Sequence, residues 1–145
     1  MPAESAAPVR QINGSCHCGN IRFVFHRPGG DEQIPVRACS CSFCVKYRAV
    51  WTSHPEGSVA LSQDDPAQVQ RYRFGSKTAD FFICTNCGVA PIVTSDIDGA
   101  NYAVVNVNCF DDVDPSEMVE SSTNFDGEGT DDRLARRQRN WMRLA

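Results

Sequence analysis

The sequence lacks a long hydrophobic run, because its uninterrupted apolar stretches reach only a few residues. A membrane-spanning helix needs about 20 consecutive apolar residues, so no membrane segment is expected. The opening stretch, MPAESAAPVR, includes an acidic residue and two prolines and lacks the apolar centre of a signal peptide. From these absences we expect a cytoplasmic protein.

Positive charge is also scarce over most of the sequence. Lysine and arginine total 14 residues against 18 aspartates and glutamates, which gives a net charge of −4. Nonspecific affinity for nucleic acids depends on clustered basic side chains, so this balance argues against nucleic acid as the main partner. The exception is residues 131–145, whose net charge is +3 and which contain Arg133, Arg136, Arg137, Arg139 and Arg143.

This arginine-rich segment has two interpretations. Leu134, Gln138, Trp141 and Met142 can share one face of a terminal helix, which would leave the arginines as its solvated side. Alternatively, the arginines bind nucleic acid. Because residues 1–130 carry a net charge of −7, we favour the solvated helix.

The remaining sequence has no internal repeat and no helical periodicity, and 145 residues suit one domain. Short runs rich in β-branched and aromatic residues, separated by turn residues, predict strands. These runs are residues 21–25, 49–52, 69–74, 81–83, 90–93 and 102–107, with turns at 74–77, 96–99 and 111–115. We therefore expect a mainly β, mostly antiparallel domain over residues 12–130. A mobile leader over residues 1–11 precedes it, and a helical basic segment over residues 131–145 follows it.

Eight cysteines require an explanation in a chain expected in the reducing cytoplasm, where disulfides rarely persist. Zinc binding explains these cysteines better than disulfides do. A Cys-x-x-Cys-Gly knuckle lets two thiolates converge on one ion, and its glycine permits the tight turn. Cys109 stands alone, and the other cysteines form three clusters: Cys16 with Cys18, Cys39 with Cys41 and Cys44, and Cys84 with Cys87.

Four cysteines from two clusters can close a tetrahedral zinc site, although spacing does not decide which pairs combine. The triplet Cys39, Cys41 and Cys44 can hold a second ion through three thiolates. Its fourth position is then open to water or substrate, as in catalytic zinc sites. In the alternative, all three clusters are structural, and Cys109 or a histidine closes the second site.

The motifs around these cysteines follow one another in a recognisable order. They are GSCHCGNIRF at 14–23, CSCSFC at 39–44, YRFG at 72–75, FICTNCGVAP at 82–91, VNVNCFD at 105–111 and FDG at 125–127. Together they resemble the glutathione-dependent formaldehyde-activating enzyme family, which also includes centromere protein V. The resemblance spans residues 14 to 127.

The resemblance implies a compact, zinc-bound, β-tent-like single domain of two sheets. It also implies two zinc ions per chain, one structural and one at an open catalytic site. The structural ion would be held by Cys16, Cys18, Cys84 and Cys87, and the catalytic ion by Cys39, Cys41 and Cys44.

An open zinc with three thiolate ligands suits a soft fourth ligand, for which a substrate thiol is the natural candidate. Coordination lowers the pKa of that thiol and keeps it as the nucleophilic thiolate. With the family name, this indicates a carbon–sulfur lyase-like enzyme that adds a glutathione-like thiol to a small aldehyde such as formaldehyde, or releases it. The alternative is a noncatalytic zinc-binding module that recognises a protein or small-molecule partner. The oligomeric state stays open.

Other polar residues are weaker candidates. Lys46 and Arg48 follow the triplet and could receive a substrate carboxylate, or they are ordinary solvated charges. His17 could relay a proton or is a surface residue of the knuckle. Cys109 is either a buried free thiol or a thiol near the open zinc. Asp126 orients a ligand or forms a turn.

Overall fold

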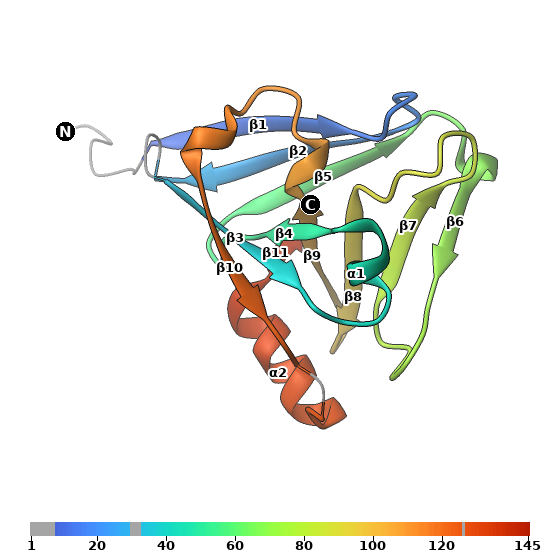
Figure 1. The fold of residues 1–145 in the computed structure, drawn as a ribbon, viewed down its shortest axis with the longest axis vertical. Helices are drawn as coiled ribbons and strands as arrows, with labels where there is room; N and C mark the ends of the chain where they lie inside the picture. The colour runs from blue at the N-terminus through green and yellow to red at the C-terminus, as the bar shows by residue number, and fades with distance from the viewer. Residues whose placement is uncertain (1–7, 30–32, 126) are drawn as a thin grey trace.

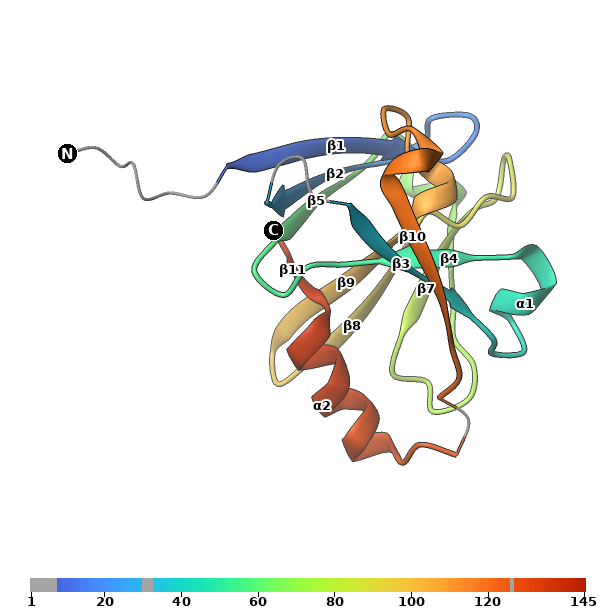
Figure 2. The same cartoon turned by 60° about the vertical axis from the view of Figure 1, so that its left-hand side comes forward.

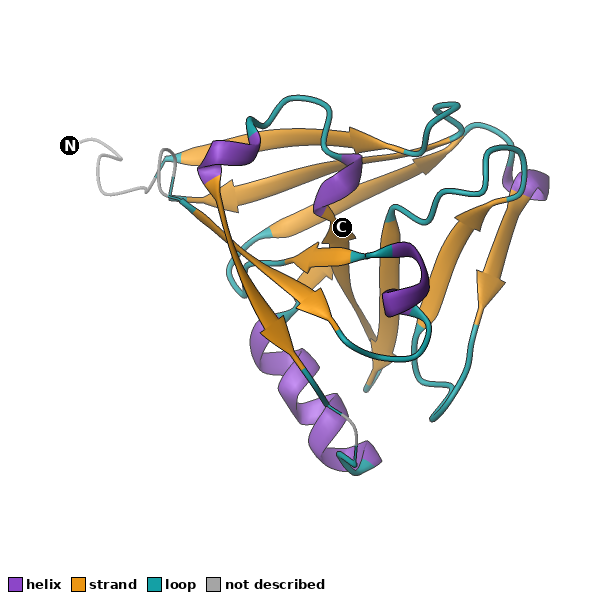
Figure 3. Cartoon of the chain, viewed as in Figure 1, coloured by secondary structure: helices purple, strands orange, loops and turns teal. Residues whose placement is uncertain are grey.

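The structure is a computed structural model that describes residues 8–29, 33–125 and 127–145. Strands are the main secondary structure of the described chain, which also has one long helix and several short helical turns (Figures 1 and 3). The strands are β1 (Val9–Ser15), β2 (Ile21–Pro28), β3 (Ile34–Cys39), β4 (Val50–Thr52), β5 (Ser58–Gln63), β6 (Val69–Tyr72), β7 (Asp80–Cys84), β8 (Ile92–Ile97), β9 (Ala100–Asn106), β10 (Met118–Thr123) and β11 (Met142–Leu144). The α-helices are α1 (Cys44–Tyr47) and α2 (Thr130–Asn140), and the 3-10 turns are η2 (Pro66–Gln68), η3 (Val107–Cys109) and η4 (Pro115–Glu117).

All these strands are hydrogen-bonded into one mixed sheet, in the order β1-β2-β5-β11-β9-β4-β3-β10. A branch leaves β9 through β8 and β7 to β6. Only the pairs β10–β3 and β11–β5 are parallel among the described strands. In Figure 1, β1, β2 and β5 run across the top of the view, whereas β6, β7 and β8 run down its right-hand side. The sheet is therefore strongly bent.

The expected mainly β, mostly antiparallel domain with a C-terminal helix is confirmed, but the expected pair of sheets is not. The strands are continuous in hydrogen bonding because β9 is paired on both edges. One edge pairs with β8, and the other is shared between β11 and β4. The β6–β7–β8 branch and the remaining strands therefore form one sheet, joined at β9.

Strand formation follows local sequence where the alternation is strong. In β2, Ile21, Phe23 and Phe25 are buried while Arg22 is exposed, which is the period of a half-buried strand. The β8–β9 hairpin forms at the predicted 96–99 turn, where Asp98 and Gly99 both have positive φ, of 53° and 83°. This is the backbone of a two-residue type I′ turn, which favours an Asp-Gly sequence.

The expected leader over residues 1–11 overlaps strand β1. Residues 1–7 lie outside the described residues, but residues 9–11 begin β1, so that part of the expectation is wrong. The reason is tertiary: β1 pairs with β2 from Val9↔Pro28 to Ser15↔Arg22. Arg10 also forms a 2.7 Å ion pair with Glu117 of η4. Neither contact is visible in local composition.

The C-terminal segment is a helix followed by a strand rather than one helix. Helix α2 ends at Asn140, and Met142 lies in β11, fully buried between β5 and β9. The expected helix face containing Trp141 and Met142 is therefore wrong. Figure 2 shows α2 beneath the sheet, reached from β10 and leading into β11. No helix of the described chain is long and apolar enough to cross a bilayer.

Two hydrophobic clusters form the core, and each includes buried members of one cysteine group. The larger cluster includes Cys16 and Cys84 together with Phe23, Phe25 and Met142. The smaller cluster contains Cys44, Trp51, Phe81, Val93, Val104 and Trp141. Each cysteine group is thus held by buried apolar side chains, which limits its freedom to move.

The close approach of Gly14 to Phe23 gives a stability prediction. A Cβ atom on residue 14 would lie 2.1 Å from Cζ of Phe23, whose side chain is 1% exposed and has little space to move. Gly14→Ala should therefore lower the free energy of unfolding by about 1–3 kcal/mol in urea titrations. Gly129→Ala, where no atom lies within 4 Å of the added Cβ, is the control. Equal stability of the two variants would contradict the prediction.

Candidate functional site

The first group of cysteines lies where two tight turns meet. Cys16 and Cys18 occupy the turn between β1 and β2, whereas Cys84 is the last residue of β7 and Cys87 lies in the turn that follows. Both turns close through backbone hydrogen bonds, from Gly19 N to Cys16 O at 3.1 Å and from Gly88 N to Cys84 O at 2.7 Å. Gly19 and Gly88 have φ values of 85° and 82°, a conformation that favours glycine. The four Sγ atoms all lie within 4.8 Å of one another.

The donor set and spacing of this group fit zinc. The Sγ atom of Cys18 lies 3.8 Å from that of Cys16 and 3.5 Å from that of Cys84. Zinc–sulfur bonds of about 2.3 Å place tetrahedral sulfurs about 3.8 Å apart. A disulfide would require about 2.05 Å, and all eight cysteines are free. The arrangement is that of a closed four-thiolate site.

The thiols of this group differ in how easily they ionise. Burial raises the pKa of Cys16 to about 11, partly offset by the backbone N–H of Ile21, which donates to its Sγ at 3.3 Å. The pKa of Cys18 is lowered to about 6, chiefly by hydrogen bonding from the Asn86 side chain. Full ionisation of such a group requires a nearby cation, which a divalent metal supplies.

The second group lies between β3 and α1. Cys39 is the last residue of β3, Cys44 is the first residue of α1, and Cys41 lies in the loop between them. Their Sγ atoms lie within 4.8 Å of one another. The backbone N–H of Cys44 donates to Cys41 Sγ at 3.3 Å, and Trp51 Nε1 donates to Cys44 Sγ at 3.4 Å. These donors favour thiolates and fix the direction of the sulfurs.

Electrostatics within this triplet concentrate negative charge on one sulfur. Hydrogen bonds from Cys39 and Cys44 lower the pKa of Cys41 to about 2. Hydrogen bonding to Cys39 and Cys41, together with burial, raises the pKa of Cys44, because both effects favour its protonated thiol. The triplet therefore favours a cation that neutralises this negative charge, and within the described residues no fourth cysteine, histidine or carboxylate joins it.

A cavity of about 400 Å³ opens beside the triplet. One part of its wall is apolar, with aromatic and aliphatic side chains, and another part is strongly basic. The apolar part is formed by Trp51, Phe74, Phe81, Val93, Val104, Phe125 and Trp141, and the basic part by Arg37, Arg133, Arg136 and Arg137. The rest of the lining consists of the cysteine triplet and small residues, namely Ser42, Gly75, Ser76, Ala79, Thr123 and Gly127. The cavity gives a small molecule access to the three cysteines.

The basic wall corrects the expectation of a solvated arginine face on α2. Arg133, Arg136 and Arg137 line the cavity, and Arg137 is buried. Of the five arginines in residues 131–145, only Arg139 and Arg143 are exposed. Spacings of three and four residues place Arg133, Arg136 and Arg137 on one helix face, a pattern visible in the sequence. The sequence prediction placed this face in solvent because arginine is usually a surface residue.

The other described candidates do not line the cavity. Lys46 and Arg48 are exposed at the end of α1, and His17 is exposed between Cys16 and Cys18. Cys109 is buried in η3, as expected for a free thiol, and burial raises its pKa to about 12. It belongs to neither cysteine group. Asp126 lies outside the described residues. Arg37, in β3, was not expected at the site, because no local motif marks it.

Comparison with known proteins gives two findings. A family model described as "Glutathione-dependent formaldehyde-activating enzyme" matches residues 11–125. That segment contains both cysteine groups but ends before α2. The crystal structure of a Rhodobacter sphaeroides protein is similar, with a TM-score of 0.56 and 24% identity, over 77% of this chain and 99% of that chain. This structural likeness supports the fold alone.

Proposed function

The chain belongs to the glutathione-dependent formaldehyde-activating enzyme family, and from this premise we propose that it is a zinc-dependent carbon–sulfur lyase-like enzyme. In the proposed reaction, a small thiol is added to a small aldehyde or released from the adduct. The observation that supports this most directly is the cysteine triplet on the wall of a cavity, without a fourth ligand among the described residues.

The two cysteine groups would have different roles. Cys16, Cys18, Cys84 and Cys87 would hold a structural zinc that ties the β1–β2 turn to the end of β7. Four thiolate ligands would satisfy the usual coordination of zinc and would leave no position for substrate. Cys39, Cys41 and Cys44 would hold a second zinc on the cavity wall, where a substrate has access.

When bound at the triplet, zinc supplies a Lewis acid that favours the ionised form of a substrate thiol at neutral pH. The protein fixes the triplet through the N–H groups of Cys44 and Trp51. Phe81, Val93 and Val104 give the cavity an apolar wall that limits competing water. The chain thereby holds a thiol and excludes solvent at the same place.

The proposed step balances without a redox partner. The sulfur of the thiol forms a bond to the carbonyl carbon, the C=O π bond breaks, and the oxygen takes up the proton released by the thiol. The product is an S-hydroxymethyl adduct when the aldehyde is formaldehyde. The reverse step breaks the carbon–sulfur bond. Formaldehyde and glutathione are the substrates that the family name implies.

The test uses zinc-loaded protein with formaldehyde and either glutathione or cysteine. Exchange spectroscopy by NMR measures how fast the S-hydroxymethyl adduct forms and breaks. We expect an acceleration of at least about tenfold over the uncatalysed exchange, which corresponds to about 1.4 kcal/mol of transition-state stabilisation. Unchanged exchange with both thiols would overturn the proposal and would favour a zinc module without catalytic activity.

A further inference from the structure

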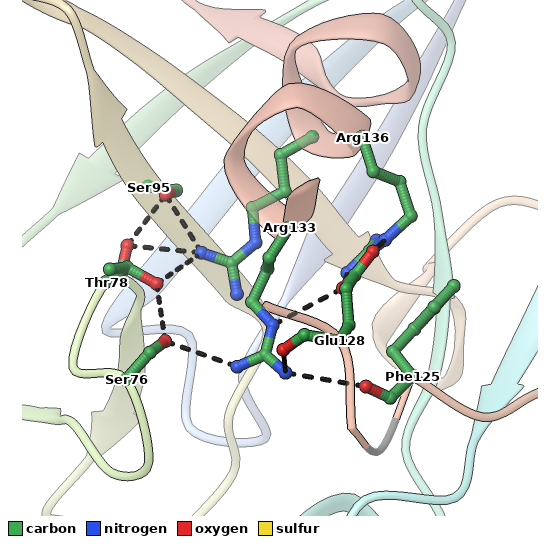
Figure 4. A network of polar contacts seen from close by, with 8 residues as sticks. Ser76, Thr78, Ser95, Phe125, Glu128, Arg133 and Arg136 are labelled. Atoms are coloured by element: carbon green, nitrogen blue, oxygen red, sulfur yellow. Dashed lines mark hydrogen bonds and ion pairs between the residues drawn. The ribbon is translucent and has the colours of Figure 1, made fainter. Parts of the chain in front are cut away.

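The arginine wall of the cavity is built largely by a part of this chain outside the segment that matches the family. Arg133, Arg136 and Arg137 belong to α2, which begins at Thr130, whereas the match ends at residue 125. Arg37 of β3 adds a fourth guanidinium to the same cavity. Figure 4 shows Arg133 and Arg136 close to Glu128, and it shows Arg133 donating to the hydroxyl group of Ser76.

Two of these arginines already have a carboxylate partner. Glu128 accepts from Arg136 Nη2 at 3.1 Å and forms a 3.4 Å ion pair with Arg133 Nε. Arg136 holds the same carboxylate through a second donor, Nε, at 3.1 Å. Arg133 also donates to Ser76 Oγ, and Arg136 stacks over the Phe125 ring at 3.6 Å. Their positions are therefore fixed within the wall.

Arg137 differs, because it is buried without a carboxylate. Arg137 is only 8% exposed. Its Nη1 donates to the carbonyl and hydroxyl oxygens of Thr78 and to Ser95 Oγ. Its Nε has no hydrogen-bond partner. No ion pair within residues 8–29, 33–125 and 127–145 reaches Arg137 or Arg37.

This arrangement is costly for a cation. Burial, together with repulsion from Arg136 and Arg133, lowers the pKa of Arg137 to about 10. Four guanidinium groups line the cavity and Glu128 neutralises only one positive charge. A buried charge of this kind is stabilised when an anion enters and accepts from its free donors.

We propose that Arg137, supported by Arg37, Arg133 and Arg136, forms a carboxylate subsite in the same cavity as the cysteine triplet. Resting on the proposed function, this makes the substrate of the site a thiol that carries a carboxylate. Sulfur would bind at the triplet, the hydrocarbon part would lie along the apolar wall, and the carboxylate would reach the arginines. The α2 arginines would thus determine which thiols this chain accepts.

A carboxylate is favoured over a phosphate because the wall already accommodates one. The guanidinium group of Arg136 holds the Glu128 carboxylate through two hydrogen bonds of 3.1 Å, and Arg133 Nε lies 3.4 Å from the same carboxylate. A second carboxylate would give the arginine cluster two negative charges against four positive ones. Phosphate would place a larger and more highly charged group beside the apolar wall, at a greater desolvation cost.

The first experiment probes the subsite without sulfur. Succinate is titrated into zinc-loaded protein by calorimetry, comparing the wild type with Arg137→Met and with the control Arg139→Met. Arg139 is exposed on the same helix and does not line the cavity. Arg137→Met should weaken succinate binding by roughly 10- to 100-fold, the loss expected for a buried charge-assisted contact. Arg139→Met should change it less than about twofold.

Two further variants protect this test against a folding defect. Arg137→Lys keeps the charge but loses the planar fork, so we expect an intermediate loss of affinity. Glu128→Gln removes the internal carboxylate, so Arg133 and Arg136 become available and succinate should bind more tightly. Weaker or unchanged binding in Glu128→Gln, equal losses in Arg137→Met and Arg139→Met, or no succinate binding to the wild type would each overturn the subsite. Inorganic phosphate binding more tightly than succinate would overturn its assignment to carboxylates.

The second experiment compares N-acetylcysteine with its methyl ester as thiols in the NMR exchange assay. N-acetylcysteine should have a KM at least about tenfold lower than that of its methyl ester. Arg137→Met should remove this difference in KM while changing kcat less. Equal KM values would overturn the subsite even if both thiols react. If neither thiol reacts but succinate binding still depends on Arg137, the proposed function fails and the subsite stands.

Discussion

Replacing Cys84 by serine is expected to prevent stable folding. Cys84 is fully buried at the end of β7, and its Sγ lies 3.5 Å from that of Cys18 in the four-cysteine group. A structural zinc site contributes on the order of 10–16 kcal/mol in zinc-finger peptides, comparable with the whole stability of a domain, about 5–15 kcal/mol. Losing one of four ligands should therefore remove most of the native population. Circular dichroism and zinc content measure this directly.

Cys109→Ala is the matched control for Cys84→Ser. Cys109 is also a buried cysteine of the same hydrophobic cluster, but it belongs to neither metal group. Its loss should cost about 1–2 kcal/mol, the effect of removing one buried atom, and should leave the zinc content unchanged. A cooperative unfolding transition in Cys84→Ser at the wild-type midpoint would contradict a structural role for this group.

Cys41→Ser is expected to abolish the exchange activity while the fold is kept. Cys41 is half-buried in the loop between β3 and α1, so its substitution disturbs little packing. It is also the sulfur on which the triplet concentrates negative charge. Zinc per chain should fall from two to one, and the exchange rate should drop by roughly 100-fold or more.

Val45→Ala serves as the control for Cys41→Ser, because Val45 is an exposed residue of α1 that does not line the cavity. It should retain two zinc ions and the wild-type exchange rate. A single zinc ion in both the wild type and Cys41→Ser would contradict the two-site arrangement. Full activity in a Cys41→Ser protein with one zinc would place the chemistry elsewhere.

The cysteine groups could be predicted well from the sequence, because ligands to one metal recur at short, characteristic spacings. Spacing identified Cys39, Cys41 and Cys44 as a unit, and the structure brings them together. It did not decide how the pairs combine, since two doublets distant in sequence meet only through the fold. The family resemblance indicated that Cys16 and Cys18 join Cys84 and Cys87, and the structure brings these four together.

Strands were predictable only where their own side chains alternate. β2 buries Ile21, Phe23 and Phe25 on one face and was expected. β10 is largely exposed and was missed, because among the described strands it pairs with β3 alone, more than 80 positions earlier at Met118↔Ile34. β11 is three residues long and depends on β5 and β9 for all its pairing. Short strands of this kind are determined by their neighbours.

The arginines of α2 show a different limit. Their spacing placed Arg133, Arg136 and Arg137 on one face, but composition could not indicate whether that face meets water or a cavity. The answer depends on Thr78 and Ser95, which accept hydrogen bonds from Arg137 across about 59 and 42 positions of sequence. Only the folded chain places these oxygens beside the helix.

The position of β11 has a consequence for how the protein is made. β11 is the strand through which the β1–β2–β5 portion is hydrogen-bonded to β9 in the described sheet order. During synthesis, residues 142–144 leave the ribosome after every other strand, so until then β5 and β9 have open edges facing each other. These open edges therefore expose the nascent chain to aggregation until β11 emerges. Pairing of β11 also holds the C-terminal end of α2 against the sheet, so the arginine wall and the sheet are completed together.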